Sequence, residues 1–175
     1  MPIVLAIGVI WLYFECMSPS VDPEELPKNL HPKVGEQAGS LVRIAGERGI
    51  QVLITDGFRS FEEQDDLYAK GRDASGNIVT HAKAGESYHN YGLAIDFALL
   101  MDNGEATWDM SFDGNGNGNP DWQEVVAIAK ELGFEWGGDW ENFKDYPHLQ
   151  MDFGLSIREL QRGKLPAVQD SAANK

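Results

Sequence analysis

Residues 87–99 read SYHNYGLAIDFAL, and this stretch decides the fold. Its second half, residues 93–99, is an apolar run typical of a buried strand, and it carries one carboxylate at Asp96. A bare carboxylate in such a strand is unfavourable unless it is paired or bound to a metal. His89 lies seven residues upstream, and this odd separation would place the two side chains on opposite faces of one straight strand. Because Gly92 can form a turn between them, we expect His89 to fold back toward Asp96.

A second strand is predicted at residues 148–153 (HLQMDF), where apolar and polar residues alternate. The alternation places three polar side chains on one face of that strand, namely His148, Gln150 and Asp152. Two imidazoles and one carboxylate are a common ligand set of catalytic zinc sites, which leave the fourth position for water. If the two strands lie side by side, the sequence predicts a zinc site formed by His89, Asp96 and His148.

The other elements follow from periodicity and capping signals. Apolar spacing, together with a capping box at Ser60 and Glu63, predicts three helices, at residues 34–48, 60–70 and 121–132. The β-branched run IQVLIT at 50–55 predicts another strand, and the polar residues 71–86 predict a loop. Aromatic residues at 134–143 are expected in the core and in the wall of a cleft. We therefore expect a small α+β domain with a central antiparallel sheet and flanking helices.

Two charged residues outside the ligand set have the right chemistry for catalysis. Asp145 precedes His148 by three residues, so its carboxylate should lie beside the metal without being an obvious ligand. A carboxylate there can act as general base and later protonate the leaving amine. Arg59 follows the predicted strand at 50–55, where its guanidinium can polarise the scissile carbonyl or bind a substrate carboxylate.

Three motif blocks resemble those of the D-alanyl-D-alanine carboxypeptidase/VanY-like zinc peptidases. They are GFRSFEEQ at 57–64, SYHNYGLAID at 87–96 and DYPH at 145–148, and the resemblance covers residues 34–152. Within that group the chain is most similar to the L-alanyl-D-glutamate endopeptidases of phage endolysins and Bacillus-type walls. The resemblance implies hydrolysis of the L-Ala–D-Glu bond in peptidoglycan stem peptides.

The same resemblance implies a role for individual residues. Zinc would be held by His89, Asp96 and His148, with Asp145 as the catalytic acid/base. Three residues would contact the substrate or the transition state, namely Arg59, Ser87 and Gln64.

A second metal site is predicted in residues 113–124, DGNGNGNPDWQE. This segment fits the EF-hand calcium loop at every constrained position, with Gly118 at the sharp turn. The oxygen donors would come from Asp113, Asn115, Asn117, Asn119, Asp121 and Glu124. Because three of these six are carboxylates, we expect a modest affinity, nearer extracellular than cytosolic calcium levels. The alternative is a flexible Asn/Gly loop without an ion.

The N-terminal residues suggest an extracytoplasmic location. Residues 3–14 (IVLAIGVIWLYF) are apolar but short of the about 20 residues of a transmembrane helix. They predict a signal peptide or membrane anchor within residues 1–17, although no Lys or Arg precedes them. A linker at 18–33, a zinc peptidase domain at 34–163 and a flexible tail at 164–175 complete the expected organisation. We expect a protein that is membrane-anchored or secreted to the cell wall.

The composition limits the kinds of partner and of covalent cross-link that the chain can have. The net charge of −14 argues against nucleic acid, which requires a basic face. The single cysteine, Cys16, excludes an intrachain disulfide. At 175 residues the chain fits one domain, and we expect a monomer that acts on peptidoglycan stem peptides.

Three alternative functions are compatible with parts of this pattern. A D-Ala-D-Ala carboxypeptidase would use the same ligand set. An Fe(II) oxygenase also uses two His and one carboxylate, but usually with one residue between His and Asp instead of six. A catalytically inactive, calcium-dependent wall-binding module would have no need of Asp145, and the complete ligand set argues against it.

Overall fold

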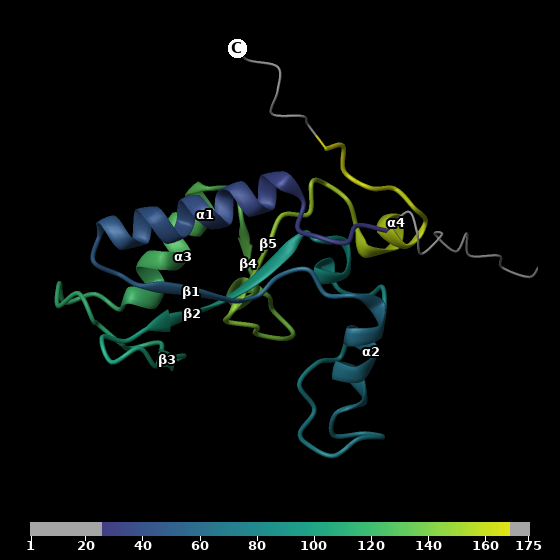
Figure 1. The fold of residues 1–175 in the computed structure, drawn as a ribbon, viewed down its shortest axis with the longest axis horizontal. Helices are drawn as coiled ribbons and strands as arrows, with labels where there is room; N and C mark the ends of the chain where they lie inside the picture. The colour runs from purple at the N-terminus through teal and green to yellow at the C-terminus, as the bar shows by residue number, and fades with distance from the viewer. Residues whose placement is uncertain (1–25, 169–175) are drawn as a thin grey trace, which may run out of the picture.

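The computed structural model describes residues 26–168 (Figure 1). The helices are α1 (Pro32–Glu47), α2 (Phe61–Ala69), α3 (Asp121–Glu131) and α4 (Ile157–Gln161), with 3-10 turns η1 (Tyr88–Tyr91) and η2 (Gly137–Asp139). The strands are β1 (Val52–Asp56), β2 (Ala94–Leu100), β3 (Ala106–Thr107), β4 (Glu135–Trp136) and β5 (His148–Gln150). Among the described residues no helix has the length and apolar character needed to cross a membrane. The predicted signal or anchor segment at 1–17 lies outside the described residues.

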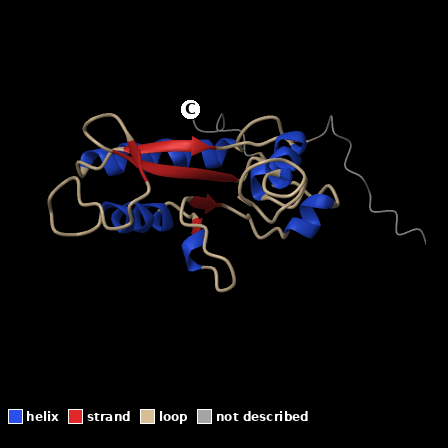
Figure 2. Cartoon of the chain, turned by 90° about the horizontal axis from the view of Figure 1, so that it is seen from below, coloured by secondary structure: helices blue, strands red, loops and turns tan. Residues whose placement is uncertain are grey.

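The strands form one antiparallel sheet in the order β1-β2-β5-β4, so β2 lies at its centre. The short strand β3 pairs with the end of β2, beyond the part that pairs with β5. Helices α1 and α3 pack against the sheet in one apolar core, and Figure 2 shows the helices and strands in a second view. The predicted α+β domain with a central antiparallel sheet is confirmed.

Alternation along β2 directs its large apolar side chains to one face of the sheet and Asp96 to the other. Ile95, Phe97 and Leu99 are buried in the core cluster that contains residues of α1 and α3. Asp96 lies between them in sequence and therefore points to the opposite face. In β5 the same alternation buries Leu149 in the core and turns His148 toward the side of Asp96. Strand alternation thus places the large apolar side chains against the helices, and the candidate metal ligands Asp96 and His148 on the opposite face of the sheet.

The helices begin where the sequence provides caps. The side chain of His31 accepts a hydrogen bond from the backbone N–H of Lys33 at the start of α1, and Pro32 occupies its first turn. The predicted capping box of α2 is confirmed: Oγ of Ser60 accepts from the N–H of Glu63 at 3.1 Å, and Oε2 of Glu63 accepts from the N–H of Ser60 at 2.8 Å.

Several predicted boundaries shift. Helix α1 begins at Pro32, two residues before the expected start, and β1 begins at Val52 and not at residue 50. Strand β5 ends at Gln150, so the predicted strand over 148–153 is too long. Oδ1 of Asp152 accepts from the N–H of Gly154 at 2.7 Å, and Phe153 adopts a left-handed φ of 53°. This side-chain-closed turn ends the alternation, so Asp152 does not share the strand face with His148.

Parts of the predicted linker and tail pack on the domain. Leu26 and Leu165 contact the small apolar cluster that contains Tyr91 and Leu160. The N–H of His31 donates to the carbonyl of Gly92 at 2.9 Å, which ties the entry segment to the turn that carries His89. The proposed domain boundaries stay predictions.

Candidate metal centre and its cleft

Asp96 and His148 are brought together by strand pairing. They are direct partners in the β2–β5 register, so their side chains leave neighbouring strands on the same face. Nδ1 of His148, the ring nitrogen nearer the main chain, lies 3.4 Å from Oδ1 of Asp96. His148 is 5% exposed, which places its ring inside the protein wall and not on the surface.

His89 reaches the same point from the turn η1. The hydroxyl of Ser87 caps this turn, and Gly92 ends it with a left-handed φ of 69°. A Cβ at Gly92 would lie 2.3 Å from the carbonyl oxygen of Asn29, so both its backbone angle and its surroundings require glycine. The reversal at Gly92 resolves the odd spacing between His89 and Asp96, as predicted.

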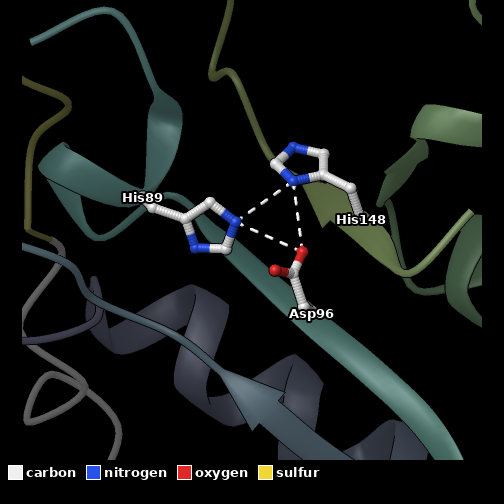
Figure 3. Close-up of side chains that lie close together, drawn as sticks. All are labelled: His89, Asp96 and His148. Carbon is white, nitrogen blue, oxygen red and sulfur yellow. Dashed lines mark hydrogen bonds and ion pairs between the residues drawn. The ribbon is translucent and has the colours of Figure 1, made fainter. Parts of the chain in front are cut away.

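The three side chains converge on one point (Figure 3). Nε2 of His89 lies 3.1 Å from Nδ1 of His148 and 3.3 Å from Oδ1 of Asp96. Within residues 26–168 this is the one group of three or more His, Cys, Asp or Glu side chains whose ligand atoms all lie within 4.8 Å of one another. Oδ1 of Asp96 is buried and has no hydrogen-bond partner among the described residues. The arrangement fits the ligand set predicted from the sequence.

The charge state of Asp96 is set by its two neighbours. Burial alone would raise the pKa of its carboxyl, but the adjacent imidazoles of His148 and His89 outweigh burial and hold the pKa well below its usual range. The Asp96 carboxylate is therefore ionised at neutral pH. Nδ1 of His89 donates to the carbonyl oxygen of Gly57 at 2.6 Å, so the other nitrogen, Nε2, presents its lone pair to Asp96 and His148.

Arg59 lies beside this centre with its guanidinium held by several contacts. It forms an ion pair with Asp56 and donates from Nη1 to Oε1 of Gln64 at 2.9 Å. Nη2 lies 3.8 Å from Oδ2 of Asp96, the carboxylate oxygen not facing the imidazoles. The side chain is 12% exposed and lines the cleft, so an anion or a carbonyl oxygen can reach it.

Gln64 lies behind Arg59, away from the cleft. It is fully buried, does not line the cleft, and donates from Nε2 to the carbonyl oxygen of Ala82 at 2.8 Å. Gln64 thus has no direct access to the cleft in this structure, and its contact with substrate stays a prediction. Its two hydrogen bonds instead connect Arg59 to the loop at 78–86, which orients the guanidinium.

Asp145 lines the cleft on the turn that leads into β5. The N–H of His148 donates to the carbonyl of Asp145 at 3.3 Å, and the N–H of Asp145 donates to the carbonyl of Gly137 at 3.2 Å. A Cβ at Gly137 would lie 2.4 Å from the backbone carbonyl oxygen of Asp145, so only glycine permits this close approach of the two chain segments. Burial raises the pKa of the Asp145 carboxyl, and the negative charge of Asp96 adds to this. A raised pKa suits a group that takes up and releases a proton.

The metal centre opens into a cleft of about 710 Å³. This volume lies within the range of small-molecule and peptide sites. The loop at 78–86 forms one wall, and the segment after η2 supplies Trp140 and Phe143. The rings of His81 and Phe143 meet edge-on with centroids 5.6 Å apart, and Ser87 also lines the cleft. As expected, the aromatic residues at 134–143 are divided between core and cleft, since Phe134 and Trp136 are buried in the core.

The predicted calcium loop lies beyond the other end of β2. The carboxylate of Asp113 accepts from the N–H groups of Asn117 and Gly118 at 3.1 and 2.9 Å. Oε2 of Glu124 accepts from the side-chain amides of Asn117 and Asn115 at 2.9 and 3.3 Å. These carboxylate oxygens therefore accept hydrogen bonds from the loop itself, and the three carboxylates of the loop are not as close together as the ligand atoms of the His89 group.

Asp121 differs from the other candidate calcium ligands because it is 2% exposed. Its Oδ2 accepts from the N–H of Gly114 at 2.9 Å, whereas its buried Oδ1 has no hydrogen-bond partner. Burial raises the pKa of its carboxyl, and the charges of Asp113 and Glu124 add to the effect. Asn119 contributes its N–H to Oδ1 of Asn117 at 2.8 Å.

Sequence patterns missed several groups around the metal centre. The carbonyl of Gly57 accepts a hydrogen bond from His89, and the carboxylate of Asp56 forms an ion pair with Arg59. A contact made by a backbone carbonyl cannot be predicted from the type of side chain at that position. His81 also lines the cleft, although no pattern in the sequence pairs it with another residue.

Comparison with known proteins gives the family. The model of a family described as D-alanyl-D-alanine carboxypeptidase matches residues 80–151, which include His89, Asp96, Asp145 and His148. Over 126 residues the chain is 64% identical to the peptidoglycan L-alanyl-D-glutamate endopeptidase CwlK of Bacillus subtilis. The aligned region covers 72% of this chain and 75% of CwlK. The chain belongs to this peptidase family.

Other similar proteins share less of their sequence with this chain. An L-alanyl-D-glutamate peptidase of Listeria phage A118 is 35% identical over 117 residues, 66% of this chain and 36% of the phage protein. The solved structure of the L-Ala D-Glu endopeptidase ChiX of Serratia marcescens has a TM-score of 0.50 at 23% identity, covering 77% of this chain and 89% of ChiX. The L,D-carboxypeptidase DacB of Streptococcus pneumoniae has a TM-score of 0.53 at 22% identity, covering 81% of each chain. These two structures share the peptidase's fold.

Proposed function

We propose that this peptidase is a zinc-dependent endopeptidase that hydrolyses the L-Ala–D-Glu bond of peptidoglycan stem peptides. The observation that carries the proposal is the convergence of His89, Asp96 and His148 within 3.1–3.4 Å at the base of an open cleft. The bond is the one named for CwlK, the relative at 64% identity. Membership of a peptidase family and the complete ligand set both support hydrolysis.

Zinc fits the donor set. Zinc–nitrogen and zinc–oxygen bonds of about 2.1 Å place the ligand atoms of a tetrahedral site about 3.4 Å apart. The observed separations of 3.1, 3.3 and 3.4 Å agree with that value. The unpartnered Oδ1 of Asp96 faces the same point as the two nitrogens, as a ligand atom would. When bound, zinc supplies Lewis acidity, which lowers the pKa of water to about 7 and polarises carbonyl groups.

The remaining side chains of the cleft divide the other tasks. Asp145, whose pKa is raised by burial, takes a proton from the attacking water and returns it to the amine of the leaving D-Glu residue. Arg59 stabilises negative charge that develops on the scissile carbonyl oxygen or binds a substrate carboxylate. Ser87, which caps the turn of His89, lines the cleft and contacts the substrate.

The alternatives can be separated by the products that form. Hydrolysis of an L-Ala–D-Glu bond exposes the amine of D-Glu and the carboxyl of L-Ala, whereas a carboxypeptidase releases a terminal D-Ala. Purified peptidoglycan is digested and the products are identified by mass spectrometry. We expect the amount of free D-Glu amines to increase with enzyme concentration. A His89→Ala protein, which lacks a ligand, is the control. Release of D-Ala without new D-Glu amines would replace the endopeptidase by the carboxypeptidase, and no release at all would favour the wall-binding module.

We further propose that residues 113–124 bind calcium. The loop matches the EF-hand pattern, and the buried, unpartnered oxygen of Asp121 beside Asp113 and Glu124 supports an ion there. Asn115, Asn117 and the carbonyl of Asn119 complete the donor set.

Glu124→Gln is expected to weaken calcium binding by about tenfold or more, because the bidentate carboxylate at the last loop position is lost. Calorimetric calcium titration measures this. Glu131→Gln, an exposed change at the other end of α3, is the matched control and should leave the affinity unchanged. Equal calcium affinity in the wild type and the Glu124 variant would show that the loop is not the site.

The location follows from the substrate. Peptidoglycan lies outside the cytoplasm, so we infer that the peptidase acts there. Attachment to the membrane through residues 1–17, or secretion, and a monomeric state are further proposals that rest on the sequence.

A further inference from the structure

We propose that Gln150 and Glu135 are positioning residues that hold His148 in the tautomer able to bind the metal. The inference rests on the proposed metal site and adds a second layer to it. Neither residue is a ligand in the proposed site. Both act through the imidazole of His148.

A continuous chain of hydrogen bonds runs from the metal centre to the surface. Nε2 of His148 lies 3.0 Å from Oε1 of Gln150, two residues further along β5 on the same strand face. Nε2 of Gln150 donates to Oε2 of Glu135 at 3.0 Å. Gln150 and Glu135 are direct partners in the β4–β5 register, which fixes this contact. His148 and Gln150 are 5% and 6% exposed, whereas Glu135 is exposed to solvent.

The direction of each hydrogen bond follows from Glu135. An ionised carboxylate can only accept, so it must face the NH₂ group of the Gln150 amide. The amide oxygen of Gln150 then faces His148 and can only accept as well. Nε2 of His148 must therefore carry the proton in the neutral ring, and Nδ1 keeps the lone pair that a metal requires. An exposed carboxylate thus determines which nitrogen is free at the metal centre.

The two imidazoles depend on different kinds of support. The ring of His89 donates from Nδ1 to the backbone carbonyl of Gly57, and this orients Nε2 toward the metal site. A substitution of the side chain at position 57 would leave that carbonyl in the chain. His148 leaves the strand directly opposite Asp96, so Nδ1 is the nitrogen within reach, and its tautomer depends on two replaceable side chains. The His148 ligand is therefore the one whose metal affinity depends on side chains that are not ligands themselves.

The test compares zinc affinity, measured by competition with a chromophoric chelator, in three proteins. Gln150→Leu removes the acceptor and is expected to weaken zinc binding by about 10- to 100-fold, the usual effect of losing a hydrogen-bond partner of a ligand. The double change Gln150→Glu with Glu135→Gln exchanges carboxylate and amide, so His148 keeps an acceptor and the charge is unchanged. We expect it to restore zinc affinity to within about threefold of the wild type.

A spectroscopic measurement reads the tautomer without any substitution. ¹⁵N NMR of the metal-free wild type, at a pH where the imidazole is neutral, should find a proton on Nε2 of His148 and none on Nδ1. A proton on Nδ1, or Gln150→Leu zinc affinity equal to that of the wild type, would overturn the inference while leaving the metal site intact. A wild-type protein that does not bind zinc would instead overturn the proposed function and this inference with it.

Discussion

Removal of the metal with a chelator is expected to abolish cleavage of wall peptides, and added zinc is expected to restore it. Asp96, His89 and His148 bring their ligand atoms within 3.4 Å of one another, and no other trio of the described His, Cys, Asp and Glu side chains is so close. The residues of the chain bind and orient the peptide, but they cannot replace the Lewis acidity that the proposed mechanism needs. The loss should therefore be complete, and it should not be a partial decrease.

The measurement is the rate of release of free amines from purified peptidoglycan. The chelated protein should keep its far-ultraviolet circular dichroism, because the sheet and α1 pack through apolar contacts independent of the metal. Magnesium should fail to restore the rate, since it prefers oxygen ligands in octahedral geometry. Full activity of a protein freed of transition metals would contradict the mechanism.

Asp145→Asn is expected to lower kcat by about 10²- to 10⁴-fold, the usual contribution of a general acid/base. The amide fills the same space but cannot accept a proton at neutral pH. Asp145 is outside the ligand trio, so the variant should bind zinc with the stoichiometry of the wild type. The separation of turnover from metal content distinguishes the acid/base role from that of a ligand.

Asp139→Asn is the matched control for this variant. Asp139 lies six residues away, is exposed, and pairs with Lys130 outside the cleft. Its kcat should equal that of the wild type. If the Asp145 variant kept normal turnover, Asp145 would lose its role, and if it lost zinc, Asp145 would have to be regarded as a ligand or as support for one.

The site could be predicted because its residues conflict with their surroundings. Asp96 is polar in an apolar strand, and Gly92 supplies a reversal that only glycine makes easily. Strand alternation then correctly placed His148 and Gln150 on the face of Asp96. Local rules were sufficient because every proposed ligand lies on or directly beside one pair of adjacent strands.

Other features depended on tertiary contacts or on signals that were overlooked. Helix α4 was not predicted, although Ser156 and Glu159 form the same capping box that identified α2. The two-residue strands β3 and β4 are too short for any periodicity. Gln64 matched a motif, but only the packing reveals that it is buried behind Arg59.

The measurement that tests the account most directly is anomalous diffraction at the zinc edge from crystals of the zinc-loaded protein. The account predicts one strong peak about 2.0–2.2 Å from Nε2 of His89, Nδ1 of His148 and Oδ1 of Asp96. A zinc peak away from these three atoms, or no peak in crystals of active protein, would contradict it.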